Sequence, residues 1–401
     1  MDNLFVTHIS NNGNDAHLVN QIESCYAKVS LYEVSLIFLL IIAFSSVIKR
    51  VRDQKASADS TLVSFDSTQL LKGLAIILLL LGHFSQQCTV GSDALPFRMT
   101  GNAAVMIFLF VSGIGIAKKY QLHADRLFWL RRIKKIATPV WLSLALIIPL
   151  NFFLIGHADP PGHLVLNFLG IFWTEFPNSP YWFITYILFY YSVYFTVAML
   201  PFKNSIKLSV LFIIPLLAVW LVVETGSMDH FVLWPQYSLV FPIGVVCGLN
   251  SSYLKKINDK IYEISPILFI LCVLFFLGHY WHGFGVYRIS HLLSFEIYTK
   301  IVFAIVNPLS FLLFLVLLVG FLEKKDFRSD FLQIFGKYSF ELYLLHFPFM
   351  VYYDFFLFRK PMVFFFFIFV TALLALSIVH QKASGFLSEL IFSKPYFAIT
   401  G

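Results

Sequence analysis

The sequence has little charge, few cysteines and no long polar stretch. Charged residues make up 13% of its 401 residues, whereas a typical soluble domain carries about 25%. Four cysteines are too few for the disulfide framework of a small secreted protein. No internal repeat is visible, and no loop between apolar stretches exceeds about 25 residues. The loops therefore leave no room for a separate soluble domain.

Apolar and aromatic residues are abundant instead. They account for 59% and 18% of the chain, with 47 Phe, and the mean hydropathy is +0.79. Apolar stretches long enough to cross a bilayer recur between residues 31 and 380. The sequence therefore predicts a polytopic membrane protein and excludes a nucleic-acid-binding factor and a secreted enzyme. We interpret the net charge of +7 as a consequence of membrane topology.

Only helices and closed barrels satisfy the backbone hydrogen bonds of a chain in lipid, and these stretches show no strand alternation. We therefore predict an all-α transmembrane bundle of ten core helices and one N-terminal accessory helix. The predicted spans are 31–48, 71–88, 101–117, 138–155, 181–200, 208–224, 234–249, 264–281, 299–321, 338–357 and 361–380. The first 65 residues would hold the accessory helix and a basic linker, and 66–401 the ten-helix domain.

Lysine and arginine alternate sharply between the two sides of this bundle. The chain has 29 lysines and arginines, and 23 of them fall in segments that we assign to the cytoplasm by the positive-inside rule. These segments are 49–72, 118–137, 201–207, 250–263, 322–337 and the C-terminal tail. The opposite side receives six, and residues 156–180 contain none. We expect a cytoplasmic C-terminus and, with an odd number of helices, an N-terminus on the outer side.

Ionisable residues inside a bilayer are costly, so each is a candidate for function. In the predicted helix 71–88, Lys72 and His83 are eleven residues apart. Eleven helical steps amount to three full turns plus about 20°, so the two side chains share a face. The rise between them is roughly 16 Å. That face would join a basic cytoplasmic entrance to a buried imidazole. Alternatively, Lys72 anchors the helix end by snorkelling and His83 packs against a neighbour.

The run Lys72-Gly-Leu-Ala-Ile-Ile-Leu-Leu-Leu-Leu-Gly-His83 resembles the signature of the membrane acyltransferase-3 family, in which Arg or Lys, ten residues and His follow one another. The family comprises bacterial O-acyltransferases that modify envelope polysaccharides. Four further stretches resemble family motifs in the expected order. They are Gly101 to Ser112-Gly113, Arg131-Arg132-Ile-Lys-Lys135 before Pro139, Pro180-Tyr181-Trp182-Phe183, and Ser339-Phe-Glu-Leu-Tyr343-Leu-Leu-His346.

Two positions depart from the family pattern. An Asp often precedes the basic residue of the signature by three positions, where this chain has Gln69; Asp66, one turn earlier, is a loose substitute. The second Arg of the basic segment is Lys135 here. Lysine keeps the charge but loses the bidentate geometry that arginine offers to phosphate, which puts close donor recognition at that position in doubt.

The resemblance implies an integral-membrane O-acyltransferase of the bacterial inner membrane. It would move an acyl group, in our expectation acetyl, from cytosolic acyl-CoA to a hydroxyl of an O-antigen, capsule or exopolysaccharide. Arg131, Arg132 and Lys135 would bind the phosphates of the donor, although positive-inside topology alone explains most of the charge of this segment. His83 is the candidate general base. Lys72 would orient the donor or stabilise developing negative charge.

Other residues are candidates for the cavity. Ser339, Tyr343 and His346 share a helix face, which fits either interhelical hydrogen bonding or contact with substrate. Glu341 lies roughly 140° around the helix from His346. Trp182 fits an interfacial aromatic belt better than a sugar platform.

Two polar stretches that we predict on the outer side contain candidate ligand-binding residues. His157, Asp159, His163, Trp173 and Glu175 lie in the segment without lysine or arginine and would suit a sugar. Arg288 would hold an anionic acceptor. We predict no metal at the nearby His279 and His282, because no carboxylate or cysteine accompanies them at ligand spacing.

The expected partners are acyl-CoA as a donor substrate, an envelope glycan that is free or lipid-linked, and membrane lipids, with no nucleic acid and no tightly bound cofactor. The main alternative is a transporter or flippase of glycan or lipid-linked sugar. Transport folds commonly show internal repeats, which are not visible here. A polysaccharide polymerase is a further alternative, although that class typically carries a longer outer loop.

Overall fold

The computed structural model consists of helices and their connections, with no strand among the residues that it describes. The all-α prediction is therefore confirmed. The described residues are 36–37, 39–41, 64–88, 100–123, 125–172, 179–224, 237–253, 256, 315, 329–353, 357 and 361–392.

Six of the described helices are long and apolar enough to cross a membrane. Their candidate spans are Asp66–Gln86, Thr100–Tyr120, Phe128–Ile155, Trp182–Met199, Asn204–Leu221 and Met362–Phe392. These spans confirm a polytopic helical membrane protein. The predicted spans 264–281 and 299–321, apart from residue 315, and most of 31–48 lie outside the described residues.

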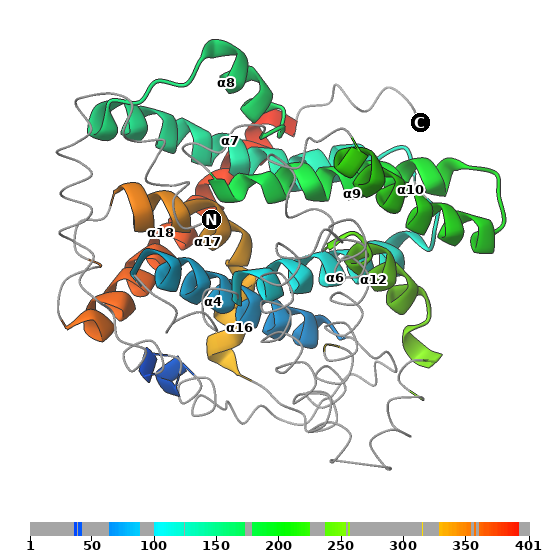
Figure 1. The fold of residues 1–401 in the computed structure, drawn as a ribbon, viewed down its shortest axis with the longest axis horizontal. Coiled ribbons are helices and arrows are strands. Elements are labelled where there is room, and N and C mark those ends of the chain that lie inside the picture. The colour runs from blue at the N-terminus through cyan, green and yellow to red at the C-terminus, as the bar shows by residue number, and fades with distance from the viewer. Residues whose placement is uncertain are drawn as a thin grey trace.

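Helix α4 (Phe65–Cys88) packs between α6 (Thr100–Tyr120) and the short α16 (Asp330–Lys337), as Figure 1 shows. Two glycines make the crossing with α16 close. A Cβ on Gly73 of α4 would overlap the carbonyl of Leu332, and a Cβ on Gly336 of α16 would overlap that of Gln69. Because glycine has no Cβ, the two backbones touch directly at this crossing.

A pair of glycines also makes the crossing of α6 with α12 (Val240–Leu249) close. Gly113 of α6 lies against the carbonyl of Phe241, and Gly244 of α12 lies against that of Phe110. By contrast, a side chain on Gly115 would enter open space. Glycine pairs thus fix the neighbours of both α4 and α6.

A second group of helices lies beside this cluster (Figure 1). Helix α7 (Phe128–Ile155) packs against α18 (Met362–Phe392), and α9 (Trp182–Met199) packs against α10 (Asn204–Glu224). The short helix α8 (Pro161–Phe168) lies outside α7. Tyrosines of α9 are buried, so this layer contributes hydroxyl groups to the interior of the bundle.

Several predicted boundaries were wrong. Helix α7 begins ten residues before the predicted 138, so the basic segment that we expected in a loop is helical, and α18 continues twelve residues past the predicted 380. Hydropathy cannot detect such extensions, because charged residues on a helix outside the bilayer resemble a loop. The predicted span 338–357 is instead α17 (Ser339–Phe347) followed by the π-helical turn Pro348–Tyr352. Proline at 348 lacks the amide hydrogen that an α-helix needs there.

Candidate active site

The two signature residues lie on one continuous helix, as the spacing predicts. Lys72 and His83 both belong to α4, and both side chains are half-buried. Each is adjacent to a glycine at a close crossing, since Gly73 meets α16 and Gly82 meets Gly101 at the start of α6. We call the helix face that carries Lys72 and His83 the α4 stripe. The close crossings hold its Lys72 end against α16 and its His83 end against α6.

At one end of the stripe, His83 meets His346 of α17. The centres of the two imidazole rings are 5.2 Å apart with the planes tilted by 35°, and the ring of Phe347 lies 5.3 Å from that of His83. Nδ1 of His83 lies 3.1 Å from Oε1 of Gln86, one turn further along α4. The structure thus brings together histidines from two separate motifs, 263 residues apart.

The hydrogen bonds of His346 fix its proton arrangement. Its ring is completely buried, and Nδ1 donates to the carbonyl oxygen of Tyr343 at 2.7 Å. A carbonyl can only accept, so the proton is on Nδ1 and the lone pair is on Nε2. Within the described part of the chain, Nε2 of His346 has no hydrogen-bond partner. The imidazole end therefore contains a buried acceptor nitrogen beside His83.

The segment 180–183, which resembles a family motif, is joined to α17 by two hydrogen bonds. The Tyr343 hydroxyl donates to the carbonyl of Pro180, and the Tyr181 hydroxyl donates to that of Leu344 at 2.6 Å. These reciprocal bonds tie α17 to the start of α9. Trp182 is half-buried and stacks on Tyr237, with ring centres 5.9 Å apart. The Tyr237 hydroxyl in turn donates to Oδ1 of Asn102 at 2.9 Å.

The opposite end of the stripe is strongly basic. Lys72 lies within electrostatic range of Lys135, which interacts in turn with Arg132, Lys119 and the carboxylate of Glu341. Clustered cations repel one another, so an anion bound among them would be stabilised. The basic motif and the first residue of the signature therefore form one cluster.

Arg132 is enclosed by aromatic rings. Its guanidinium carbon lies 5.8 Å from the ring centre of Tyr120, 5.7 Å from that of Phe128 and 5.2 Å from that of Tyr191. These distances allow cation–π attraction, which holds the guanidinium in place without neutralising its charge. Nε of Arg132 is buried and has no partner among the described residues. The charge of Arg132 remains available for an anion.

Arg131 differs from its neighbour. It forms an ion pair with Asp125 and donates from Nε to the Tyr120 hydroxyl at 3.2 Å. The carboxylate of Asp125 offsets much of the Arg131 charge. Of the three predicted donor-binding residues, Arg132 and Lys135 therefore provide most of the unbalanced positive charge.

Helix α17 contributes a side chain to each end. Ser339 and Glu341 are buried like Tyr343 and His346. Glu341 accepts a hydrogen bond from Nε2 of Gln381 at 3.3 Å and interacts with Lys135, so it belongs to the basic end. This placement agrees with its predicted angular distance from His346.

Sequence reasoning missed two buried polar groups. His380 of α18 lies with Nε2 3.0 Å from the hydroxyl of Ser143 on α7. Lys207, which we assigned to a cytoplasmic loop, is buried and donates to the carbonyls of Leu122 and Ala198 at 3.1 and 2.9 Å. His380 is the last residue of the predicted span 361–380, where we expected the membrane interface, whereas α18 continues to Phe392.

Five residues that the sequence analysis considered lie outside the described residues, namely Arg288, Trp173, Glu175 and the two histidines at which we predicted no metal, His279 and His282. In the described part of the segment that we predicted on the outer side, Nε2 of His157 lies 3.2 Å from Oδ1 of Asp159.

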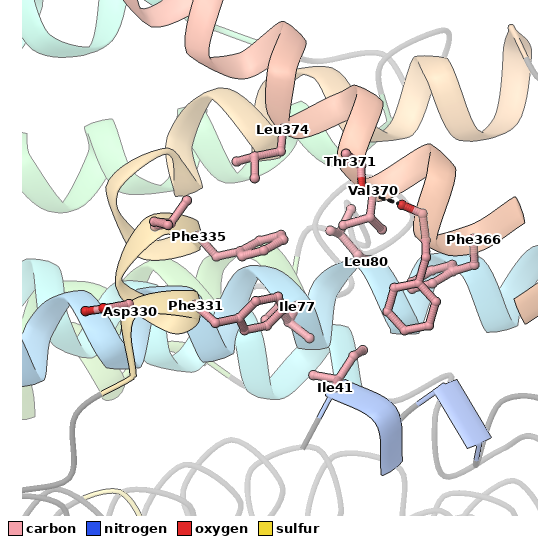
Figure 2. A pocket seen from close by; sticks show the side chains of 12 residues that line it. Ile41, Ile77, Leu80, Asp330, Phe331, Phe335, Phe366, Val370, Thr371 and Leu374 are labelled. Carbon is pink, nitrogen blue, oxygen red and sulfur yellow. Dashed lines mark hydrogen bonds between the residues drawn. The ribbon is translucent and has the colours of Figure 1, made fainter. Parts of the chain in front are cut away.

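The structure also contains an apolar pocket of about 220 Å³ between α4, α16 and α18 (Figure 2). Ile77 and Leu80 of α4 line it together with Phe335 and Phe366. No predicted site residue lines this pocket, and Ile77 lies roughly 140° around α4 from Lys72. It therefore lies on a different face from the Lys72–His83 stripe. In the described part of the chain, no three His, Cys, Asp or Glu side chains gather as metal ligands would.

Comparison with known proteins identifies the family. Residues 65–380 match a family model described as an acyltransferase domain, whereas no curated protein and no solved structure matches the chain. The matched range contains both histidines of the imidazole end and all the residues of the basic end. Since it also covers most of the chain, this helical membrane protein belongs to the acyltransferase-3 family and is an acyltransferase.

Proposed function

We propose that this membrane acyltransferase moves an acyl group, most simply acetyl, from cytosolic acyl-CoA to a hydroxyl of a bacterial envelope glycan. The observation that carries the proposal is the arrangement of α4. One face of this helix joins a cluster of cations at Lys72 to a pair of imidazoles at His83. The two ends suit the two ends of an acyl-CoA molecule.

Acyl-CoA carries its phosphates and its thioester at opposite ends of an extended pantetheine arm. The cations of Arg132 and Lys135 suit the phosphates, because charge-assisted hydrogen bonds to phosphate are among the strongest. A rise of roughly 16 Å along α4 would then separate the phosphates from the thioester. Lys72 accordingly orients the donor and lies too far from His83 to stabilise charge at the reacting carbon. By the positive-inside rule, the basic end faces the cytosol. The use of a cytosolic donor would place the bundle in the inner membrane.

The imidazole end suits the chemical step. A glycan hydroxyl is a weak nucleophile until a base removes its proton. In our mechanism the hydroxyl oxygen attacks the thioester carbonyl carbon while an imidazole nitrogen of His83 takes the hydroxyl proton. The new C–O bond forms, the C–S bond breaks, and the departing thiolate receives the proton from the His83 imidazolium. The products are an O-acyl ester and CoA with a free thiol.

Purified protein in lipid nanodiscs tests the proposal directly. We expect label from acetyl-CoA to appear on envelope glycan, and mass analysis to find one added acetyl group per modified sugar. A matched preparation without the protein should transfer none. Absence of transfer together with movement of glycan across proteoliposomes would overturn the proposal in favour of a transporter.

A further inference from the structure

We propose that Gln86 is a positioning residue for His83, which holds the hydrogen of the neutral ring on Nδ1 and leaves Nε2 as the nitrogen that takes the proton of the acceptor hydroxyl. The inference rests on the proposed function, because it assigns which nitrogen acts as the base there. Its starting point is the 3.1 Å contact between Nδ1 of His83 and the side-chain carbonyl oxygen Oε1 of Gln86.

The position of Gln86 on α4 makes this contact possible. Residues three apart on a helix are neighbours on its surface, so Gln86 can reach the His83 ring. Fourteen helical steps place Gln86 about 40° from Lys72, and Gln86 therefore extends the α4 stripe beyond His83. The two intervening residues, Phe84 and Ser85, are buried, whereas Gln86 is exposed. The pair thus lies where the stripe reaches the surface of the bundle.

The chemistry of the two atoms fixes the tautomer of His83. A carbonyl oxygen can only accept, so Nδ1 of His83 is the donor and carries the hydrogen, and the lone pair of the neutral ring is on Nε2. His346 has the same arrangement, with Nδ1 donating to the Tyr343 carbonyl and the lone pair on Nε2. Neither imidazole offers a hydrogen from Nε2. This end of the stripe therefore suits a ligand that brings its own hydrogen, as an acceptor hydroxyl does.

The contact with Gln86 also stabilises the charged form of the base. As the hydroxyl oxygen attacks the thioester carbon, Nε2 of His83 takes the hydroxyl proton, and Nδ1 keeps its hydrogen throughout. The ring is then an imidazolium, so the Nδ1–H···Oε1 bond becomes charge-assisted and stronger. When the C–S bond breaks, Nε2 returns the proton to the thiolate. An asparagine amide takes the corresponding place beside the histidine of papain-like proteases, and a carboxylate does so in hydrolase triads.

Two substitutions of Gln86 separate this role from simple packing. Gln86→Glu keeps an oxygen that accepts from Nδ1 at the same reach, so we expect kcat within about threefold of wild type. Gln86→Met keeps the length of the side chain but removes the acceptor. We expect kcat to fall by about tenfold or more in this variant, with the KM for acyl-CoA unchanged, because a hydrogen bond to a charged group is lost. Equal kcat values for the Glu and Met variants, or wild-type kcat in the Met variant, would overturn the inference.

Gln333→Met is the matched control, the same change at a half-buried glutamine of α16, and it should leave kcat unchanged. A second readout needs no turnover. In ¹⁵N spectra of histidine-labelled resting protein, assigned by loss of the His83 signals in His83→Ala, Nδ1 of His83 should be protonated and Nε2 unprotonated. In Gln86→Met the hydrogen should shift in part to Nε2.

An unprotonated Nδ1 of His83 in wild type, or an identical spectrum in Gln86→Met, would contradict the inference even if the protein transferred acyl groups. Absence of acyl transfer in wild type would instead count against the proposed function, and the spectra would still decide the tautomer.

Discussion

The two ends of α4 differ in chemistry although they share one helix face. At the Lys72 end, cations gather from α4, α6 and α7, and three aromatic rings enclose Arg132. At the His83 end, the rings of His83, His346 and Phe347 meet. The first environment favours a polyanion and the second favours proton transfer to or from a neutral group. Under the proposed function, donor binding and acyl transfer would therefore take place at opposite ends of α4.

The largest expected effect comes from removing the imidazole. His83→Ala should lower kcat for acyl transfer by about a hundredfold or more, the typical contribution of a positioned general base. Initial rates at saturating donor and acceptor would measure it, with thermal unfolding as a check that the variant is folded. A variant that turns over at the wild-type rate would show that His83 is not the base.

A smaller effect is expected at the basic end. Arg132→Gln combined with Lys135→Gln should weaken acyl-CoA binding by about tenfold or more, because charge-assisted hydrogen bonds to phosphate are lost. Calorimetric titration would measure the dissociation constant. Arg126→Gln, on the exposed loop before α7, is the matched control and should bind as wild type does. Unchanged affinity in the double variant would exclude the proposed donor site.

A substitution of Gly73, the residue next to Lys72, tests whether the close contact between α4 and α16 holds the basic end in place. Gly73→Ala would drive a methyl group into the Leu332 carbonyl, so we expect a loss of about 1–3 kcal/mol of stability. Gly115→Ala, which meets open space, should cause no comparable loss. Thermal unfolding midpoints in the same detergent would compare them. Equal midpoints would mean that the α4–α16 contact is looser than described.

The smallest effect concerns the departure from the family pattern. Lys135→Arg should strengthen acyl-CoA binding by about threefold, because arginine adds bidentate geometry to the same charge. Competition with labelled acyl-CoA would resolve such a change. Weaker binding in Lys135→Arg would show that the family pattern does not transfer to this position.

The sequence predicted the α4 stripe because helical periodicity is local. Helix geometry alone predicts that Lys72 and His83 share a face of α4. The existence of α9 and α10 could be predicted from apolar runs long enough to cross a bilayer. The meeting of His83 with His346 was not predictable in the same way. It depends on which helices are neighbours in the bundle, and hydropathy carries no information on that order.

Amphipathic and polar helices were missed for a different reason. Residues 128–137 are helical but carry Arg131, Arg132 and Lys135, so the apolar span that hydropathy detects begins only after them. Helix α16 is short, and its Ser329 cap, which accepts from the Leu332 amide at 3.3 Å, is a signal that a cap search would have found.

Turnover of the Arg132→Gln, Lys135→Gln double variant at saturating acyl-CoA tests the separation of the two ends most directly. Because the imidazole end is intact in this variant, the account predicts a kcat close to wild type once weak binding is overcome. A kcat that falls as far as that of His83→Ala would contradict it, since the cations would then take part in the chemical step.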